Sequence, residues 1–194
     1  MRELIIATHN QHKIDEIQEM VSGKLKLISL KELGQKTEIP ETGSTLKENA
    51  AQKARYVFEK YGKDCFADDT GLEVEALNGR PGVYSARYAG ERCSFDDNID
   101  LLLEEMAGKT NRKACFKTVI CLIENGKERY FEGRCDGVIT TERYGKKGFG
   151  YDPVFIPNGF GESFAEMTAE QKNSISHRGK ATRKFIEYIL DEQK

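Results

Sequence analysis

The sequence predicts an α/β protein in which helices cover a mixed, partly parallel sheet. Three observations support this fold class. Residues 4–30 follow the order strand, helix, strand, which favours a parallel pair of strands. Residues 45–61 carry apolar side chains at helical spacing. Residues 113–135 alternate apolar and polar side chains on either side of Asn125-Gly126, the strongest short signal for a β-hairpin.

The first predicted strand is the short apolar run from Leu4 to Ala7. A helix is expected from about Gln11, because the apolar residues that follow share one helical face, at Ile14, Ile17, Met20 and Val21. Residues 25–30 alternate apolar and polar side chains and predict a second strand.

The next segment predicts a capped helix and a broken strand. Thr45 and Glu48 have the spacing of a capping box at the start of the helix over residues 45–61. Residues 65–67 predict a short strand that ends in a loop, Asp68 to Gly71, and residues 72–77 predict that the strand resumes. A helix is expected over residues 94–106.

The rest of the chain predicts a long hairpin and a final helix. The hairpin strands are residues 113–124 and 127–135. A glycine-rich turn at residues 148–153 and a short strand come next, and Thr168 with Gln171 has the pattern of a helix cap. The final helix is expected from His177 to Asp191. The length of 194 residues fits one domain, residues 1–194, with room for a small second lobe.

Composition excludes several classes of protein. Apolar residues make up 38% and charged residues 32% of the chain, which is typical of a globular fold with a core. The net charge of −2 argues against a nucleic-acid binder, and no apolar run is long enough for a membrane helix. The first residues lack the long apolar stretch of a signal peptide, so we expect a cytoplasmic protein. The five cysteines are scattered and odd in number, which predicts reduced thiols.

One candidate site is the segment from Thr8 to Lys13, between the first strand and its helix. Backbone N–H groups at a helix start favour a phosphate, to which Thr8, Asn10 and Lys13 add donors and positive charge. The alternative is that Asn10 only caps the helix and Lys13 is solvated. His9 and His12 flank this segment at a spacing that suits a metal, but no further ligand accompanies them.

A second candidate is the pair Asp68-Asp69. Adjacent carboxylates repel each other unless a cation neutralises them, and oxygen-rich coordination of Mg²⁺ is the usual answer. Glu41, in another polar loop, is a further candidate ligand. The alternative is an acidic turn in which Gly71 supplies a positive φ.

Two further candidates lie in the last third of the chain. In the turn from Gly148 to Pro153, Phe149 or Tyr151 is suited to stack on a base, and Asp152 to accept a hydrogen bond from a ring N–H. The alternative is a turn whose aromatic rings belong to the core. His177-Arg178 begins the final helix, where positive charge opposes the helix dipole; this indicates a polar ligand or, alternatively, a solvated helix start.

Taken in chain order, these motifs closely resemble the inosine/xanthosine triphosphate pyrophosphatase family. The resemblance runs from about residue 4 to residue 185, and His9 departs from the glycine or asparagine that family members often carry. The matching segments are Thr8-x-Asn10-x-x-Lys13, Glu41-Thr42-Gly43, Glu48-Asn49-Ala50 with Lys53, Ala67-Asp68-Asp69-Thr70-Gly71-Leu72, Pro81-Gly82-Val83-Tyr84-Ser85-Ala86-Arg87, Gly148-Phe149-Gly150-Tyr151-Asp152-Pro153, and Lys172 with Ser176-His177-Arg178.

The resemblance implies two lobes around an active-site cleft, a homodimer, and Mg²⁺-dependent hydrolysis of ITP, dITP or XTP to the monophosphate and pyrophosphate. It implies that Glu41 and Asp69 bind Mg²⁺ and that Asp69 accepts the proton of the attacking water. The alternative is that the metal activates this water, because an aspartate with a pKa of about 4 is a weak base. It implies that the remaining site residues bind substrate: Thr8, His9, Asn10, Gln11, His12, Lys13, Lys53 and Thr70 around the phosphates, and Phe149, Gly150, Tyr151, Asp152, Lys172, His177 and Arg178 around the purine.

Other functions stay open at this point. A pyrophosphatase for pyrimidine nucleotides, or a general nucleotide phosphatase, would use the same metal site and differ in base preference. A sensor would bind triphosphates without turnover, although repelling carboxylates give a pure binder of polyanions little benefit. A protein-interaction scaffold does not account for the concentration of polar loops.

Overall fold

The computed structural model describes residues 2–21 and 23–191, which form two compact units. The first unit comprises Met1–Asp69, Thr118–Gly133 and Arg178–Lys194, and the second comprises Thr70–Lys117 and Arg134–His177. Three strands continue from one unit into the other: β3 (Cys65–Val74), β5 (Lys113–Glu124) and β6 (Lys127–Ile139).

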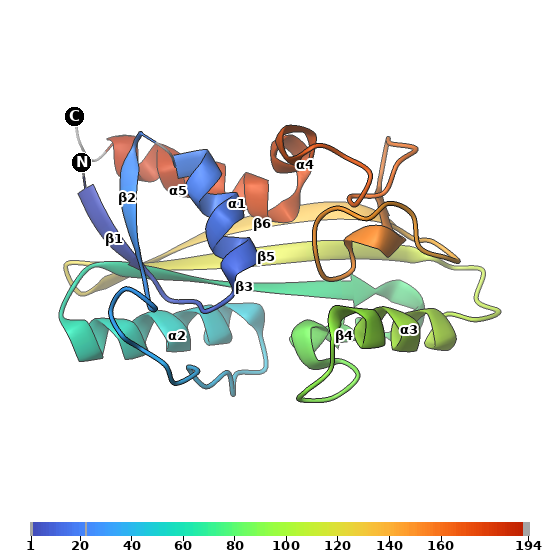
Figure 1. Ribbon diagram of the computed structural model, residues 1–194, viewed down its shortest axis with the longest axis horizontal. Helices are drawn as coiled ribbons and strands as arrows, with labels where there is room; N and C mark the ends of the chain where they lie inside the picture. The colour runs from blue at the N-terminus through green and yellow to red at the C-terminus, as the bar shows by residue number, and fades with distance from the viewer. Residues whose placement is uncertain (1, 22, 192–194) are drawn as a thin grey trace. The chain divides into compact units, whose positions relative to one another are not determined.

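The first unit is built on parallel strands. Strand β1 (Arg2–Ile6) pairs in parallel with β2 (Leu25–Ser29) and with the start of β3, in the registers Leu4↔Leu27 and Ile6↔Phe66. Helix α1 (Gln11–Val21) connects β1 to β2, so the predicted strand, helix and strand are confirmed. Helices α1 and α5 (His177–Asp191) cover one face of these strands, and α2 (Leu46–Tyr61) covers the other (Figure 1).

Side chains from α1, α5 and the strands form the core of this unit. The rings of Phe66 on β3 and Phe185 on α5 lie 4.8 Å apart, and Ile17 of α1 packs into the same cluster. Helix α2 begins with the predicted capping box, because Thr45 accepts a hydrogen bond from the Glu48 amide. Packing thus fixes α1 and α5 on one face, and a local cap fixes the start of α2 on the other.

Strand β3 differs from the prediction. Residues 68–71 were expected to form a loop, but they lie inside a single strand of 10 residues. Adjacent polar residues predict the end of a strand when only the local sequence is considered. Their ion-pair partners come from segments that are distant in the sequence, so a local pattern does not show them. The strand then ends at Val74, and Glu75–Leu77 form a turn of 3₁₀ helix where a strand was expected.

The second unit contains the remaining residues of β3, β5 and β6 and two short strands. Strand β4 (Pro81–Gly82) pairs with β3, and β7 (Phe155–Pro157) runs antiparallel to β6 in the register Gly137↔Pro157. Helices α3 (Phe95–Glu105) and α4 (Ala169–Ile175) lie on opposite faces (Figure 1). Short 3₁₀ helices, Ser85–Arg87 and Asp152–Val154, complete this unit.

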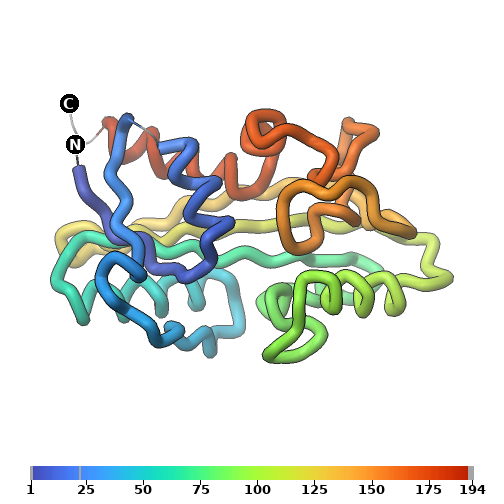
Figure 2. The backbone as a smooth tube through the Cα atoms, in the orientation of Figure 1, coloured from blue at the N-terminus to red at the C-terminus, as the bar shows by residue number. Residues whose placement is uncertain are grey.

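Strands β5 and β6 are neighbours in the sheet and run side by side (Figure 2). Asn125 and Gly126 connect them, both with positive φ, at 49° and 76°. These angles suit the Asn-Gly dipeptide, whose residues tolerate the left-handed region. Within residues 2–21 and 23–191, no helix is both long and apolar enough to cross a membrane.

The cap of α2 gives a direct test of this local account. Thr45→Ala removes the acceptor for the Glu48 amide, so we expect the free energy of unfolding to fall by about 1 kcal/mol. Urea denaturation followed by circular dichroism measures the change. Thr110→Ala, at an exposed position, is the control. An equal loss in both variants would contradict the capping role.

Candidate functional site

The site in the first unit is organised by two consecutive residues of β3, Asp68 and Asp69. Consecutive side chains of a strand point to opposite faces of the sheet. Here Phe66 contacts α5, whereas the Cys65 thiol donates a hydrogen bond to the Ala54 carbonyl of α2, at 3.2 Å. Asp68 follows Phe66 to the face of α1 and α5, and Asp69 follows Cys65 to the face of α2. Both carboxylates are buried, with 0% and 6% of each residue exposed.

On the face of α1 and α5, Asp68 pairs with two cations. Its Oδ2 lies 2.9 Å from Nζ of Lys13 and 3.6 Å from Nε of Arg178. Arg178 also forms an ion pair with Glu16 of α1. Burial alone would raise the pKa of Asp68, but Lys13 and Arg178 outweigh it and hold this pKa below its ordinary value.

Lys13 belongs to the start of α1, where the backbone is prepared for an anion. Asn10 caps this helix, because its Oδ1 accepts a hydrogen bond from the Lys13 amide at 3.3 Å, and the Asn10 amide contacts Thr8 Oγ1 at 3.2 Å. The first N–H groups of a helix have no partner within it, which makes them donors for a phosphate. The Lys13 side chain is 13% exposed, and burial lowers the pKa of its ammonium against the opposing effect of Asp68.

On the face of α2, Lys53 joins two carboxylates. Its ammonium pairs with Glu41 and lies 3.4 Å from Oδ1 of Asp69. Burial alone would lower the pKa of Lys53, but Asp69, Glu41 and Asp68 raise it overall. Burial raises the pKa of Asp69, and Glu41 and Asp68 raise it further against the opposing effect of Lys53 and Lys13. Two carboxylates therefore share one buried ammonium.

This arrangement fits a divalent cation. Oδ2 of Asp69 is buried and accepts no hydrogen bond from any residue that the structure describes. Carboxylate oxygens are the ligands Mg²⁺ prefers, and Mg²⁺ commonly completes its coordination with water and substrate phosphates. No group of three or more His, Cys, Asp or Glu residues suited to a metal occurs in the described part of the chain. Glu41 and Asp69 thus match a cation that arrives with further oxygen ligands.

The loop that carries Glu41 is held on α2 by the side chains of Asn49 and Gln52, to which the sequence analysis gave no role. Asn49 Oδ1 accepts a hydrogen bond from the Gly43 amide at 2.8 Å, and Gln52 Oε1 accepts one from the Thr42 amide at 3.0 Å. A Cβ added to Gly43 would lie only 2.8 Å from Asn49 Oδ1, so this close approach requires glycine. The signal available in the sequence was an asparagine among the apolar positions of this helix, and the structure shows that this asparagine is fully buried.

The candidate site in the second unit is a charged pair beside an aromatic ring. Oδ2 of Asp152 accepts hydrogen bonds from Nζ of Lys172 at 2.6 Å and from the Phe149 amide at 2.9 Å. The Lys172 ammonium lies 5.0 Å from the centre of the half-buried Phe149 ring. The turn therefore presents an aromatic ring, a cation and a carboxylate together.

Two other predicted residues of this unit are more enclosed. The His177 ring stacks on Phe116 with centroids 4.5 Å apart, and only 4% of the residue is exposed. The buried Tyr151 donates its hydroxyl hydrogen bond to the Ser85 carbonyl at 2.8 Å. Tyr151 thus packs in the core of the turn, whereas Phe149 is the more accessible ring.

The predicted residues divide between the units. Those of the first unit are Thr8, His9, Asn10, Gln11, His12, Lys13, Glu41, Lys53, Asp69 and Arg178, and those of the second are Thr70, Phe149, Gly150, Tyr151, Asp152, Lys172 and His177. His177 and Arg178, neighbours in the sequence, have contacts in different units. The exposed Gln11 side chain pairs with Asp15 at 2.7 Å, and His9 Nε2 lies 3.1 Å from the Thr37 carbonyl oxygen. The roles of all these predicted residues toward substrate stay predictions.

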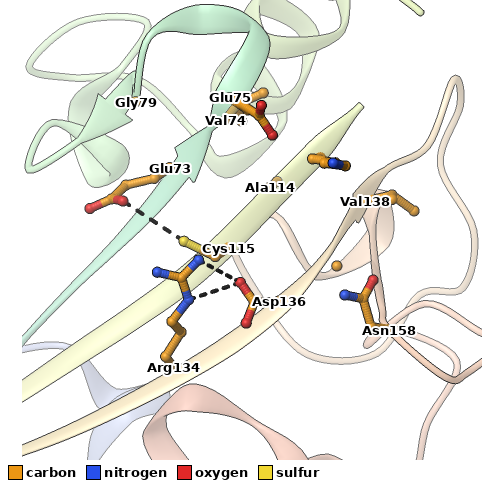
Figure 3. Close-up of a pocket in the computed structure, with 12 residues that line it drawn as sticks. Glu73, Val74, Glu75, Gly79, Ala114, Cys115, Arg134, Asp136, Val138 and Asn158 are labelled. Carbon is orange, nitrogen blue, oxygen red and sulfur yellow. Dashed lines mark hydrogen bonds and ion pairs between the residues drawn. The ribbon is translucent and has the colours of Figure 1, made fainter. Parts of the chain in front are cut away.

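The second unit also contains a pocket of about 630 Å³ that no sequence motif indicated (Figure 3). Three carboxylates, Glu73, Glu75 and Asp136, and two cations, Lys113 and Arg134, line it. Arg134 pairs with Asp136 at 2.6 Å, and Glu73 pairs at 2.6 Å with Lys117, which lies outside the lining. Cys115 lies between these pairs, with its thiol 3.8 Å from Glu73 Oε2. Because carboxylates outnumber cations in this lining, the pocket does not favour an anionic ligand such as a triphosphate.

Comparison with known proteins identifies the family. A model of the Ham1 family matches residues 4–188. A protein of Flavobacterium psychrophilum named dITP/XTP pyrophosphatase is 54% identical over 187 residues, covering 96% of this chain and 98% of its own. A Porphyromonas gingivalis protein of the same name is 51% identical and covers 98% of each chain. The solved Ham1 protein of Staphylococcus aureus has a TM-score of 0.89 at 39% identity, with 100% of both chains covered.

These matches confirm the resemblance drawn from the motifs and the mixed, partly parallel α/β fold. A solved HAM1 protein of Coxiella burnetii agrees, with a TM-score of 0.90 and 38% identity over 98% of this chain and 100% of its own. The family match extends over the segments that carry Lys13, Lys53, Asp69, Phe149 and Lys172. The chain belongs to the Ham1 family.

Proposed function

We propose that this chain hydrolyses the deaminated purine nucleoside triphosphates ITP, dITP and XTP to the monophosphate and pyrophosphate, with Mg²⁺ as cofactor. This reaction keeps such nucleotides out of nucleic acids. The observation that carries the proposal is the buried Lys53 that joins Glu41 to Asp69, with Asp69 Oδ2 left without a donor in the described part of the chain. The relatives named dITP/XTP pyrophosphatase give the substrate class.

The first unit holds the triphosphate in this proposal. The first turn of α1 offers backbone N–H groups, and Thr8, Asn10 and Lys13 stand at the same helix start. Lys53, on the other face of β3, adds a second ammonium. Fixed positive charge of this kind stabilises the negative charge that develops as a phosphoryl group is transferred.

Asp69 accepts the proton of the water that attacks the α-phosphorus. The new bond joins the water oxygen to this phosphorus, and the bond to the departing pyrophosphate breaks. Glu41 and Asp69 would hold Mg²⁺, which would supply Lewis acidity to the reaction. Thr70 follows Asp69 in β3 and contributes to the same end of the substrate.

The second unit reads the purine. Phe149 stacks on the base, with Gly150 and Tyr151 shaping the turn around it. Asp152 accepts from the ring N–H, and Lys172 and His177, together with Arg178 of the first unit, donate toward the six-position carbonyl. Adenine presents an amino group and a bare nitrogen at these positions, and unpaired buried groups of this kind give up to about 10⁴-fold discrimination.

The proposal extends to the domain organisation, the oligomeric state and the cellular location of the protein. Residues 1–194 form one catalytic domain of two lobes that acts as a homodimer in the cytoplasm. The family resemblance supports these features, and relatives whose chains match this one over 98% of their own length support the single catalytic domain.

Release of pyrophosphate from ITP, XTP, GTP, ATP and CTP tests the function directly. We expect Mg²⁺-dependent turnover of ITP and XTP, at least about 10²-fold above that of ATP in kcat/KM, and loss of turnover in EDTA. Equal turnover of all five nucleotides would contradict the assigned base-reading roles. Tight binding of ITP without hydrolysis would favour a sensor.

Gly148→Ala tests the reading of the base. Gly148 has a φ of +74°, and an added Cβ would lie 2.1 Å from Asp152 Oδ2, so the alanine displaces the carboxylate that Lys172 contacts. We expect the preference for ITP over ATP in kcat/KM to fall by about tenfold or more.

Gly159→Ala is the matched control for that variant. Gly159 has a φ of +86° and no atom within 4 Å of an added Cβ, so it carries similar backbone strain without the clash. An unchanged preference in Gly148→Ala, or the same loss in Gly159→Ala, would contradict the role given to Asp152.

A further inference from the structure

The proposed mechanism gives no task to Asp68, although its carboxylate is the more deeply buried of the two on β3. Asp68 is 0% exposed, against 6% for Asp69. An ionised carboxylate is costly to bury, and it persists where cations compensate it. Asp68 has two such cations, Lys13 at 2.9 Å and Arg178 at 3.6 Å.

The Asp68 side chain points to the opposite face of β3 from Glu41, Asp69 and Lys53. Asp69 faces α2 and shares Lys53 with Glu41. Asp68 faces α1 and α5, so it does not join Glu41 and Asp69 around one metal ion. Because Asp68 is fully buried, it also does not touch substrate. Its ion pairs with Lys13 and Arg178 are the direct route by which Asp68 affects the reaction.

Of the three paired side chains, that of Lys13 is the most exposed. The Lys13 side chain is 13% exposed, whereas those of Asp68 and Arg178 are 0% and 4% exposed. A lysine ammonium sits on a flexible stem of four carbons, and its position depends on what anchors it. Asp68 anchors Lys13 from inside the protein, beside the N–H groups of the first turn of α1.

We propose that Asp68 is a positioning residue that holds the Lys13 ammonium in place for the substrate phosphates. The proposal rests on the function given above. Arg178 completes the arrangement, because its pairing with Glu16 ties α5 to α1 around the same carboxylate. Asp68 and Asp69 thus have separate duties: one orients a phosphate-binding lysine, and the other faces the metal and the water.

A double-mutant cycle tests the proposal. Asp68→Asn keeps the shape of the side chain and removes its charge, and Lys13→Met removes the ammonium. We expect Asp68→Asn to lower kcat/KM for ITP by about 10²-fold, with a rise in KM that a smaller folded fraction would not produce. The double variant should match Lys13→Met alone within about twofold. Asp64→Asn, which removes a carboxylate paired with Arg2 at 2.9 Å, is the control and should leave both constants unchanged.

Additive losses in the double variant would overturn the proposal, because they would mean that Asp68 acts independently of Lys13. So would an Asp68→Asn variant with wild-type kcat/KM. If Asp68→Asn does not fold, the double variant is compared with Lys13→Met, because the double variant removes both members of the ion pair. A lower kcat/KM in the double variant than in Lys13→Met would again overturn the proposal. Absence of ITP turnover in the wild-type chain would contradict the proposed function as well, which distinguishes the two failures.

Discussion

The alternation of side chains along β3 is the constraint on which the first unit depends. A strand turns consecutive residues to opposite faces, so two adjacent carboxylates never share one environment. Asp68 meets Lys13 and Arg178 beneath α1 and α5, and Asp69 meets Lys53 beside α2. Each face supplies its own cations, which reduces the repulsion between the two negative charges, although Asp68 still raises the pKa of Asp69.

The two faces differ in charge, and this difference suits different tasks. Asp68, Glu16, Lys13 and Arg178 balance one another, so this face is complete without a metal. On the other face Glu41 and Asp69 both pair with Lys53, so two carboxylates face one ammonium, an arrangement that suits a cation. Asn49 and Gln52 fix the loop that carries Glu41, so the two carboxylates are held before any ligand arrives.

Local patterns in the sequence predicted the elements that local interactions stabilise. The parallel unit β1-α1-β2 and the cap at Thr45 follow from periodicity and side-chain chemistry within a few residues. Local patterns did not predict that β3 continues through Asp68 and Asp69, because the partners of these residues come from distant segments. Arg178 and Glu16 are 162 positions apart, a pairing that only the tertiary fold creates. The family motifs named most candidate residues, yet only the structure showed that Asp68 and Asp69 face different helices.

The separation of duties between these two carboxylates is tested most directly by titrating Mg²⁺ into ITP turnover. The half-activating Mg²⁺ concentration is measured at saturating ITP for the wild-type chain, Asp68→Asn and Asp69→Asn. The account predicts that Asp69→Asn raises this concentration by about tenfold or more, while Asp68→Asn leaves it near the wild-type value despite slower turnover. An equal shift in both variants would show that both carboxylates serve the metal, and would contradict the account.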